Sequence, residues 1–170
     1  MDLESGFARP GGDRAVAEAG RIEEAAAGAG AALVGGPVLC VGTDLVDVEE
    51  FRTALARQPR FAVRVFTPEE RAYCELPADP AERYAVRFAA KEAVLKALGV
   101  GLSGSVLTEI EVVRAASGRP SVRLVGRAAA LAEEAGVRSW LITLTHGRTL
   151  AHAFVAGLAA PPLPRGPELP

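Results

Sequence analysis

The stretch that most constrains the fold runs from Arg87 to Gly99 and reads RFAAKEAVLKALG. Its apolar residues recur at helical spacing, and Ala, Leu, Lys and Glu are strong helix formers. Gly99 supplies the usual stop signal just after the last turn. The sequence therefore predicts a helix over about residues 81–98, around which the rest of the chain is organised.

Charged residues on this predicted helix occur at spacings that bring them together. Arg87 and Lys91 are four residues apart, as are Glu92 and Lys96, so each pair stacks on one helix face. The simplest interpretation of Glu92 and Lys96 is an exposed ion pair worth roughly 0.3 kcal/mol. The functional interpretation is a carboxylate that binds a hard cation, with a lysine one turn further on facing phosphate. The helix alone does not decide between them.

The composition of the chain limits the possible classes of protein. Its 170 residues are 49% hydrophobic and 24% charged, as expected for one main globular domain. The net charge of −2 gives no overall basic field that would favour nucleic acid. Cys40 and Cys74 form neither a disulfide framework nor a metal-ligand spacing. Because no segment is apolar enough to span a membrane, we expect a cytoplasmic protein with no membrane partner.

The two ends of the chain differ in composition from the middle. Residues 1–36 are rich in Ala, Gly, Glu and Arg, which predicts a disordered, low-complexity N-terminal extension. Acidic and basic residues interrupt it, so it is not a secretory signal. Residues 159–170 are expected to be a loose, Pro-rich tail. The folded domain is therefore expected over residues 37–158.

The first predicted element of this domain ends in an unusual carboxylate. The apolar run from Val38 to Val46 predicts a buried strand. Asp44 lies near its end, where a carboxylate must be hydrogen-bonded, paired or bound to a metal. An alternative role for Asp44 is the N-cap of a helix expected over about residues 48–57.

Basic residues cluster around the turn that follows this helix, together with two aromatic residues. They either form a solvated face or attract an acidic partner through local positive potential. A new helix is then expected to begin at Thr67-Pro68-Glu69-Glu70, with Thr as N-cap, Pro in the first position and acids in the first turn. The clustered residues are Arg52, Arg57, Arg60, Phe61, Arg64 and Phe66.

The part of the chain after residue 99 predicts further strands and one short helix. Three glycines form a loop whose backbone could approach a ligand closely. His146, at the mouth of the last hairpin, would by itself more often be a packed or capping residue than a functional one. The features are the glycines Gly99, Gly101 and Gly104, strands over 106–114 and 121–125, a helix over 127–135, and a hairpin of 140–145 with 150–155.

Five motifs, taken in order, resemble the holo-acyl-carrier-protein synthase family of small 4′-phosphopantetheinyl transferases. The resemblance covers about residues 37–158, and the central block is the most specific. It implies an α+β fold in which a short, mostly antiparallel sheet packs against a long central helix. The motifs are Gly42-Thr43-Asp44, Phe61-x-x-Arg64-x-Phe66-Thr67-x-x-Glu70, the block from Arg87 to Gly99, Gly118-Arg119-Pro120, and Thr143-Leu144-Thr145-His146.

The resemblance implies an Mg²⁺-dependent holo-[acyl-carrier-protein] synthase. Coenzyme A would donate its 4′-phosphopantetheine group to a serine hydroxyl of an apo acyl carrier protein, releasing adenosine 3′,5′-bisphosphate. The diphosphate of coenzyme A needs a divalent cation, Mg²⁺ or alternatively Mn²⁺, to neutralise its charge. Asp44 and Glu92 match the family's metal-binding pair. Lys96 would stabilise or protonate the leaving oxygen. Either Glu92 or a metal-polarised water would accept the serine proton.

The resemblance also implies ligand and partner contacts. Arg87 and His146 match positions that contact the adenosine end of coenzyme A, including its 3′-phosphate. The family forms trimers with shared active sites, so we expect a homotrimer that serves lipid metabolism such as fatty acid biosynthesis. The carrier could equally belong to polyketide or peptide assembly. Expected coenzyme A contacts are Arg87, Lys91, Lys96, Gly99, Gly101, Pro120 and His146, and expected carrier contacts are Arg52, Arg60, Phe61 and Arg64.

Two alternatives remain at this level. The chain could be a catalytically weak relative that only binds carrier proteins or coenzyme A. Glu50 and Gly147, which depart from the family pattern, favour this alternative. It could also be an unrelated metal-dependent nucleotide enzyme, but it has no phosphate-cradling motif. The presence of Asp44, Glu92 and Lys96 together favours the transferase.

Overall fold

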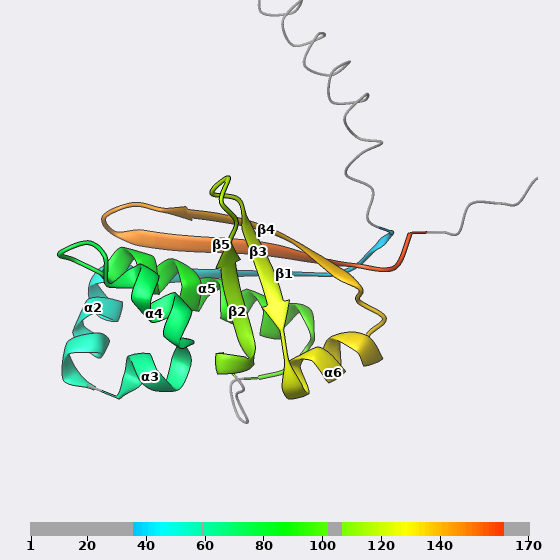
Figure 1. Cartoon of the computed structure of the whole chain (residues 1–170), viewed down its shortest axis with the longest axis horizontal. Helices are drawn as coiled ribbons and strands as arrows, with labels where there is room; N and C mark the ends of the chain where they lie inside the picture. Colours follow the sequence, from blue (N-terminus) through cyan, green and yellow to red (C-terminus); the bar gives the residue numbers. More distant parts are fainter. Residues whose placement is uncertain (1–35, 59, 102–106, 162–170) are drawn as a thin grey trace, which may run out of the picture. The chain divides into compact units, whose positions relative to one another are not determined.

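The computed structural model describes residues 36–58, 60–101 and 107–161 (Figure 1). The predictions for the N-terminal extension before residue 36, for the tail beyond residue 161 and for Gly104 lie outside these residues. In the three described segments, no helix combines the length and the apolar character that crossing a membrane requires.

The predicted central helix is confirmed as α5, Ala81–Ala97. Leu98 closes it, and Gly99 follows with φ of 69°, a left-handed conformation that glycine adopts without strain. Twelve of its 17 residues are buried, which explains why its sequence shows no wide polar face. The helix therefore forms the core of the domain.

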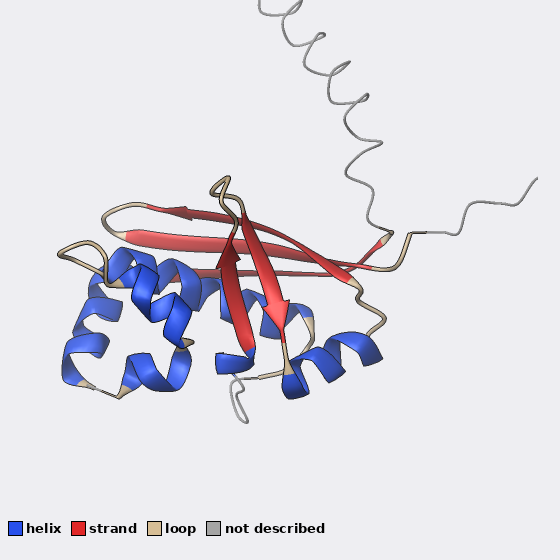
Figure 2. Ribbon diagram, in the orientation of Figure 1, coloured by secondary structure: helices blue, strands red, loops and turns tan. Residues whose placement is uncertain are grey.

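A three-stranded antiparallel sheet packs against α5, in the order β1-β5-β4 (Figure 2). Its strands are β1 (Val38–Asp47), β4 (Ser139–His146) and β5 (Leu150–Leu158). The predicted hairpin is thus confirmed as β4 and β5. A Cβ atom on Gly42 would lie 1.9 Å from the carbonyl oxygen of Ala93 in α5. Because only glycine permits this approach, β1 can lie directly on the helix.

The prediction that the first strand is buried is wrong. β1 pairs only with β5 and forms an edge of the sheet. Its side chains alternate: Gly42 and Asp44 face α5, whereas Val41 and Leu45 point the other way and are 56% and 59% exposed. An apolar run does not distinguish a strand buried on both faces from one whose second face is left uncovered in the monomer.

A second, two-stranded antiparallel sheet consists of β2 (Ile110–Arg114) and β3 (Pro120–Leu124). The strand predicted over 106–114 begins later, because Leu107–Glu109 form a 3₁₀ turn and residue 106 lies outside the described residues. Glu109 accepts a hydrogen bond from the backbone N–H of Ala128 and so holds this turn against α6 (Gly126–Glu134).

Three helices connect β1 to α5: α2 (Val48–Arg57), α3 (Phe61–Val65) and α4 (Pro68–Cys74). The sequence predicted α2 and the start of α4, where Thr67 and Glu70 form a capping box, but it did not predict α3. The N-cap of α2 is Asp47, which accepts hydrogen bonds from two backbone N–H groups. The capping role considered for Asp44 is therefore excluded, and the predicted α+β class is confirmed.

Candidate active site

Asp44 and Lys96 are brought together by the packing of β1 on α5. Asp44 Oδ1 lies 2.6 Å from Lys96 Nζ, although the two residues are 52 positions apart in the chain. The Asp44 side chain is only 14% exposed, whereas that of Lys96 is 54% exposed. The lysine head group therefore remains accessible to a ligand while it contacts the carboxylate.

Glu92 lies one helical turn before Lys96 and is 8% exposed. Burial raises the pKa of Glu92, and the neighbouring Asp44 carboxylate raises it further, whereas Lys96 partly lowers it. Its Oε1 atom is buried and has no hydrogen-bond partner within the described residues. A buried carboxylate with a free oxygen beside a second carboxylate is an arrangement that a bound cation would stabilise.

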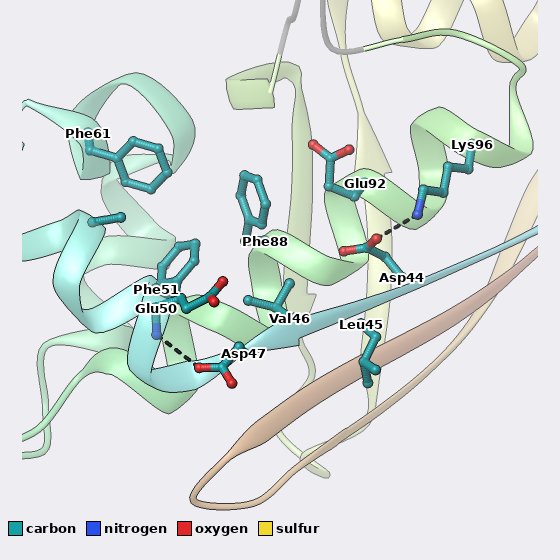
Figure 3. A pocket seen from close by; sticks show the side chains of 11 residues that line it. Asp44, Leu45, Val46, Asp47, Glu50, Phe51, Phe61, Phe88, Glu92 and Lys96 are labelled. Atoms are coloured by element: carbon teal, nitrogen blue, oxygen red, sulfur yellow. Dashed lines mark hydrogen bonds and ion pairs between the residues drawn. The ribbon is translucent and has the colours of Figure 1, made fainter.

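These three side chains line a pocket of about 490 Å³ (Figure 3). Asp44, Glu92 and Lys96 lie on one side, and aromatic rings from α2, α3 and α5 form the other. Phe51 packs against Phe61 and Phe88, with ring centroids 5.6 and 5.3 Å apart. The pocket thus combines an acidic, oxygen-rich side with an apolar side large enough for part of a substrate.

The donor set suits a hard divalent cation. Among the described residues, no group of three or more His, Cys, Asp or Glu side chains could hold a metal ion, so no third side chain of these types joins Asp44 and Glu92 at one metal position. Mg²⁺ is commonly held by one or two carboxylates, with phosphate oxygens and water completing its shell. Two carboxylates and a free oxygen on Glu92 therefore fit Mg²⁺ when a phosphorylated substrate is present.

A separate cationic cleft is built around the ring of Tyr73 in α4. The guanidinium carbons of Arg83, Arg87 and Arg114 lie 4.5, 4.2 and 5.7 Å from the ring centroid. None of the three arginines forms an ion pair within the described part of the chain, and Arg87 is 5% exposed with its Nε unpartnered. Pro120 and His146 line the same cleft, which has a volume of about 190 Å³. Such a cluster is strongly attractive to phosphate.

The predicted coenzyme A contacts thus fall into two groups within one chain. Lys96 lies at the pocket with Asp44 and Glu92, whereas Arg87, Pro120 and His146 line the cleft around Tyr73. No residue lines both cavities. Nine residues separate Arg87 from Lys96, which rotates them to opposite sides of α5, about 180° apart. Gly99 and Gly101 follow α5 and are exposed.

The structure corrects the prediction that Lys91 contacts coenzyme A. Its side chain is fully buried and lies 2.7 Å from the Glu70 carboxylate. The ammonium group also donates hydrogen bonds to the carbonyl oxygens of Leu107 and Ile110. With these partners and no exposed surface, Lys91 has no contact to offer a ligand and instead joins α4, α5 and the start of β2.

The predicted carrier contacts surround the aromatic side of the pocket. Phe61 lines the pocket. Arg60, at the N-cap of α3, and Arg64, in its last turn, are both exposed. Arg52 differs from this pair because it is already held by Glu49 at 3.1 Å and Asp79 at 2.9 Å. Glu50, the departure from the family pattern, lines the pocket as well.

The sequence did not reveal several residues of these two cavities. Arg83 lies four residues before Arg87, so helical spacing could have found it. Tyr73 and Arg114 come from α4 and β2, and nothing in the sequence pattern brings them to α5. Likewise, Phe51 and Phe88 line the pocket, and neither was predicted to do so.

The fold and the two cavities define a small α+β protein whose pocket carboxylates suit a divalent cation and whose arginine cleft suits phosphate. Residues 40–155 match the family described as the 4′-phosphopantetheinyl transferase superfamily. A holo-[acyl-carrier-protein] synthase of Moorella thermoacetica is 43% identical over 72% of this chain and 92% of its own length. The chain therefore belongs to the 4′-phosphopantetheinyl transferase superfamily, as the sequence resemblance predicted.

Solved structures agree with this assignment. The holo-[acyl-carrier-protein] synthase of Neisseria meningitidis has a TM-score of 0.65 and 29% identity, covering 71% of this chain and 98% of that one. A Chronobacterium ammoniagenes structure described as an ACPS–CoA complex has a TM-score of 0.63 and 29% identity, covering 70% of this chain and 96% of that one. The predicted fold of the transferase domain is confirmed.

Proposed function

We propose that the protein transfers the 4′-phosphopantetheine group of coenzyme A to a serine hydroxyl of an apo acyl carrier protein. The observation that carries this proposal is the meeting of Asp44, Glu92 and Lys96 at one pocket, with a free buried oxygen on Glu92. The names of the relatives, holo-[acyl-carrier-protein] synthases, give the same reaction. The by-product is adenosine 3′,5′-bisphosphate.

In this mechanism Asp44 and Glu92 hold Mg²⁺, with Mn²⁺ as an alternative. When bound there, such a cation would supply positive charge against the diphosphate of coenzyme A. Lys96, whose ammonium is largely exposed beside Asp44, donates to the leaving phosphate oxygen. Glu92 is one candidate base for the serine hydroxyl, but a carboxylate bound to the cation is a weaker proton acceptor than a free one. A metal-polarised water is the other candidate.

The carrier protein docks beside the aromatic side of the pocket. Arg60 and Arg64 present two exposed cations there, and Phe61 joins them to the pocket, which suits an acidic partner with an apolar contact. Arg52 contributes less, because Glu49 and Asp79 already compensate its charge. Which carrier is served, that of fatty acid biosynthesis or another, is determined by this surface.

A homotrimer with shared active sites accounts for the separation of the two cavities. The cleft with Arg87, Pro120 and His146 lacks the carboxylates, and the pocket lacks the arginines. One coenzyme A could use both if the cleft of one chain faced the pocket of its neighbour. The exposed apolar face of the three-stranded sheet, with Val41, Leu45 and Phe154, supports such an assembly.

The unpaired thiols Cys40 and Cys74 are compatible with a reducing compartment, and we place the enzyme in the cytoplasm. The folded domain of the proposed enzyme is residues 37–158.

Mass spectrometry of an apo carrier protein incubated with coenzyme A, Mg²⁺ and this protein tests the reaction. We expect a mass gain of one phosphopantetheine, lost when the metal is chelated. Asp44→Ala and Glu92→Ala should each abolish it, and the control Glu133→Gln, on α6, should not. Deleting residues 1–36 should leave it intact. No transfer to any carrier, together with retained binding of coenzyme A, would instead support the binding module that Glu50 in the pocket favours.

A further inference from the structure

Glu82 makes a contact that none of the roles above uses. It lies in the first turn of α5, and its Oε2 is 3.2 Å from Nδ1 of His146, the last residue of β4. The two residues are 64 positions apart in the chain, so the contact depends on the docking of β4 beside the start of α5. Because a carboxylate accepts hydrogen bonds, this geometry requires the hydrogen of the imidazole on Nδ1.

The contact turns the other imidazole nitrogen towards the ligand cavity. His146 lines the cleft around Tyr73, whereas Glu82 is not one of the lining residues. Nε2 has no hydrogen-bond partner within the described ranges of the chain. The carboxylate thus holds the ring from behind and leaves Nε2 available at the cleft surface, in the arrangement by which metal- and substrate-binding histidines are commonly oriented.

The charges around this histidine make its orientation important. The same cleft is lined by Arg83 and Arg87 of α5, Arg114 of β2 and Tyr73 of α4. Glu82 contacts this cleft only through His146. Glu82 is the hydrogen-bond partner of His146 Nδ1 among the described residues, so its removal would leave the orientation of the ring unfixed. As a stabilising ion pair, the contact is worth little, because the two side chains are 34% and 41% exposed.

We propose that Glu82 is a positioning residue for coenzyme A: it fixes the Nδ1–H form of His146, so that Nε2, which carries the lone pair in this form, accepts a hydrogen bond from the adenosine end of the substrate. This rests on the proposed function, which assigns His146 to that end. Glu82 itself does not touch the substrate.

The first experiment observes the free protein and needs no activity. The chain has two histidines, so nitrogen-15 shifts of the imidazoles are assigned with a His152→Gln variant. At alkaline pH, the wild type should show His146 protonated on Nδ1. Glu82→Ala should shift it towards the Nε2–H form, which free imidazole prefers, and Glu82→Gln should restore Nδ1–H because the amide oxygen still accepts. An Nε2–H form in the wild type would overturn the proposal.

The second experiment measures binding of coenzyme A by calorimetry, which does not depend on transfer. Glu82→Ala should weaken binding about three- to tenfold, which is the range of one ordinary hydrogen bond. Glu82→Gln should bind within about twofold of wild type, and the control Glu133→Gln, which removes an exposed ion pair of the same 3.2 Å length, should have no effect. The double variant Glu82→Ala/His146→Ala should bind coenzyme A as tightly as His146→Ala alone. Equal binding by wild type and Glu82→Ala, or equal losses from Ala and Gln, would overturn the role of Glu82.

These outcomes are separate from those of the proposed function. A wild-type protein that binds coenzyme A but transfers nothing contradicts the transferase and leaves the positioning test intact. An active wild type whose Glu82→Ala variant binds coenzyme A normally contradicts only the positioning role. In kinetics, Glu82→Ala should raise KM for coenzyme A and leave kcat nearly unchanged.

Discussion

At the scale of single residues, ionisation of the Glu92 carboxyl group opposes folding of the metal-free protein. Burial and the Asp44 carboxylate raise its pKa above the usual 4.5. The native state therefore prefers the protonated form, and this contribution to stability is complete at pH values below the unfolded pKa. It is lost as the pH rises through the folded pKa. At neutral pH, which lies above the unfolded pKa, Glu92 therefore costs stability until a cation compensates its charge.

Glu92→Gln should consequently stabilise the metal-free protein at neutral pH. We expect Tm to rise by roughly 2–4 °C for each kcal/mol of unfolding free energy recovered. The Tm of the variant should also fall less steeply than that of the wild type as the pH rises above the usual glutamate pKa. Added Mg²⁺ should raise the Tm of the wild type and not that of the variant. Thermal scans across pH, with and without Mg²⁺, make the comparison. A variant less stable than the wild type at neutral pH without metal would contradict this account.

At the scale of secondary-structure elements, Gly42 allows β1 to lie on α5. An added methyl group would overlap the carbonyl oxygen of Ala93 at 1.9 Å, so the strand would have to move away from the helix. Asp44 lies two residues further along the same face of β1, and any such shift would separate it from Lys96.

Gly42→Ala should therefore lower stability by about 1–3 kcal/mol and reduce transfer more strongly than it reduces folding. Denaturant unfolding and initial rates would measure the two effects. Gly147→Ala is the stability control, because no atom lies within 4 Å of the added carbon and its φ is not positive. If Gly42→Ala were as stable and active as the wild type, β1 would not be held at this distance.

The buried pair of Lys91 and Glu70 joins three elements. Glu70 also accepts hydrogen bonds from the backbone N–H groups of Thr67 and Val112, so both charges are fully partnered. Lys91→Met would leave the Glu70 carboxylate buried without a counter-charge, at a cost of about 3–5 kcal/mol. Combining it with Glu70→Gln should recover part of this loss in denaturant unfolding. A double variant less stable than Lys91→Met alone would contradict the charge argument.

The sequence predicted those elements whose formation depends on neighbouring residues, and it failed where formation depends on distant ones. The extent of α5 and the capping box of α4 were predictable, because propensity, the Gly99 stop and the Thr67–Glu70 spacing all act within a few residues. The exposure of β1, the short α3 and the burial of Lys91 were not, because each depends on which distant segment packs against the residue. The same limit explains the site. Asp44, Glu92 and Lys96 came from a family resemblance, whereas Tyr73 and Arg114 required the packed structure.

At the scale of the whole molecule, the outward face of the three-stranded sheet is apolar and open in the monomer. Strand register puts Val41 opposite Ala156 and Leu141, and Leu45 opposite His152 and Thr145. Phe154 lies on the same face and is 40% exposed. An exposed apolar face of this kind is typical of an interface between chains.

We expect the wild type to sediment at three times the mass of one chain. Leu45→Glu and Phe154→Glu should each give monomers, because a carboxylate would be buried at the interface. The monomers should also lose transfer activity if coenzyme A needs the cleft of a neighbour. Leu76→Glu is a matched control, since Leu76 is 74% exposed and lies in the loop after α4, outside the sheet. A fully active monomer would contradict the shared-site arrangement.

The chain enters and leaves the described domain side by side. Gly36 donates its N–H to the carbonyl of Ala159 at 3.1 Å, and Ala159 donates to the carbonyl of Pro37 at 2.9 Å. A short peptide could therefore splice the end of β5 to the start of β1 and close the backbone into a ring. New ends could then be opened at the turn after His146, and such a circular permutant would keep every strand pairing while moving the start of translation to the opposite end of the sheet.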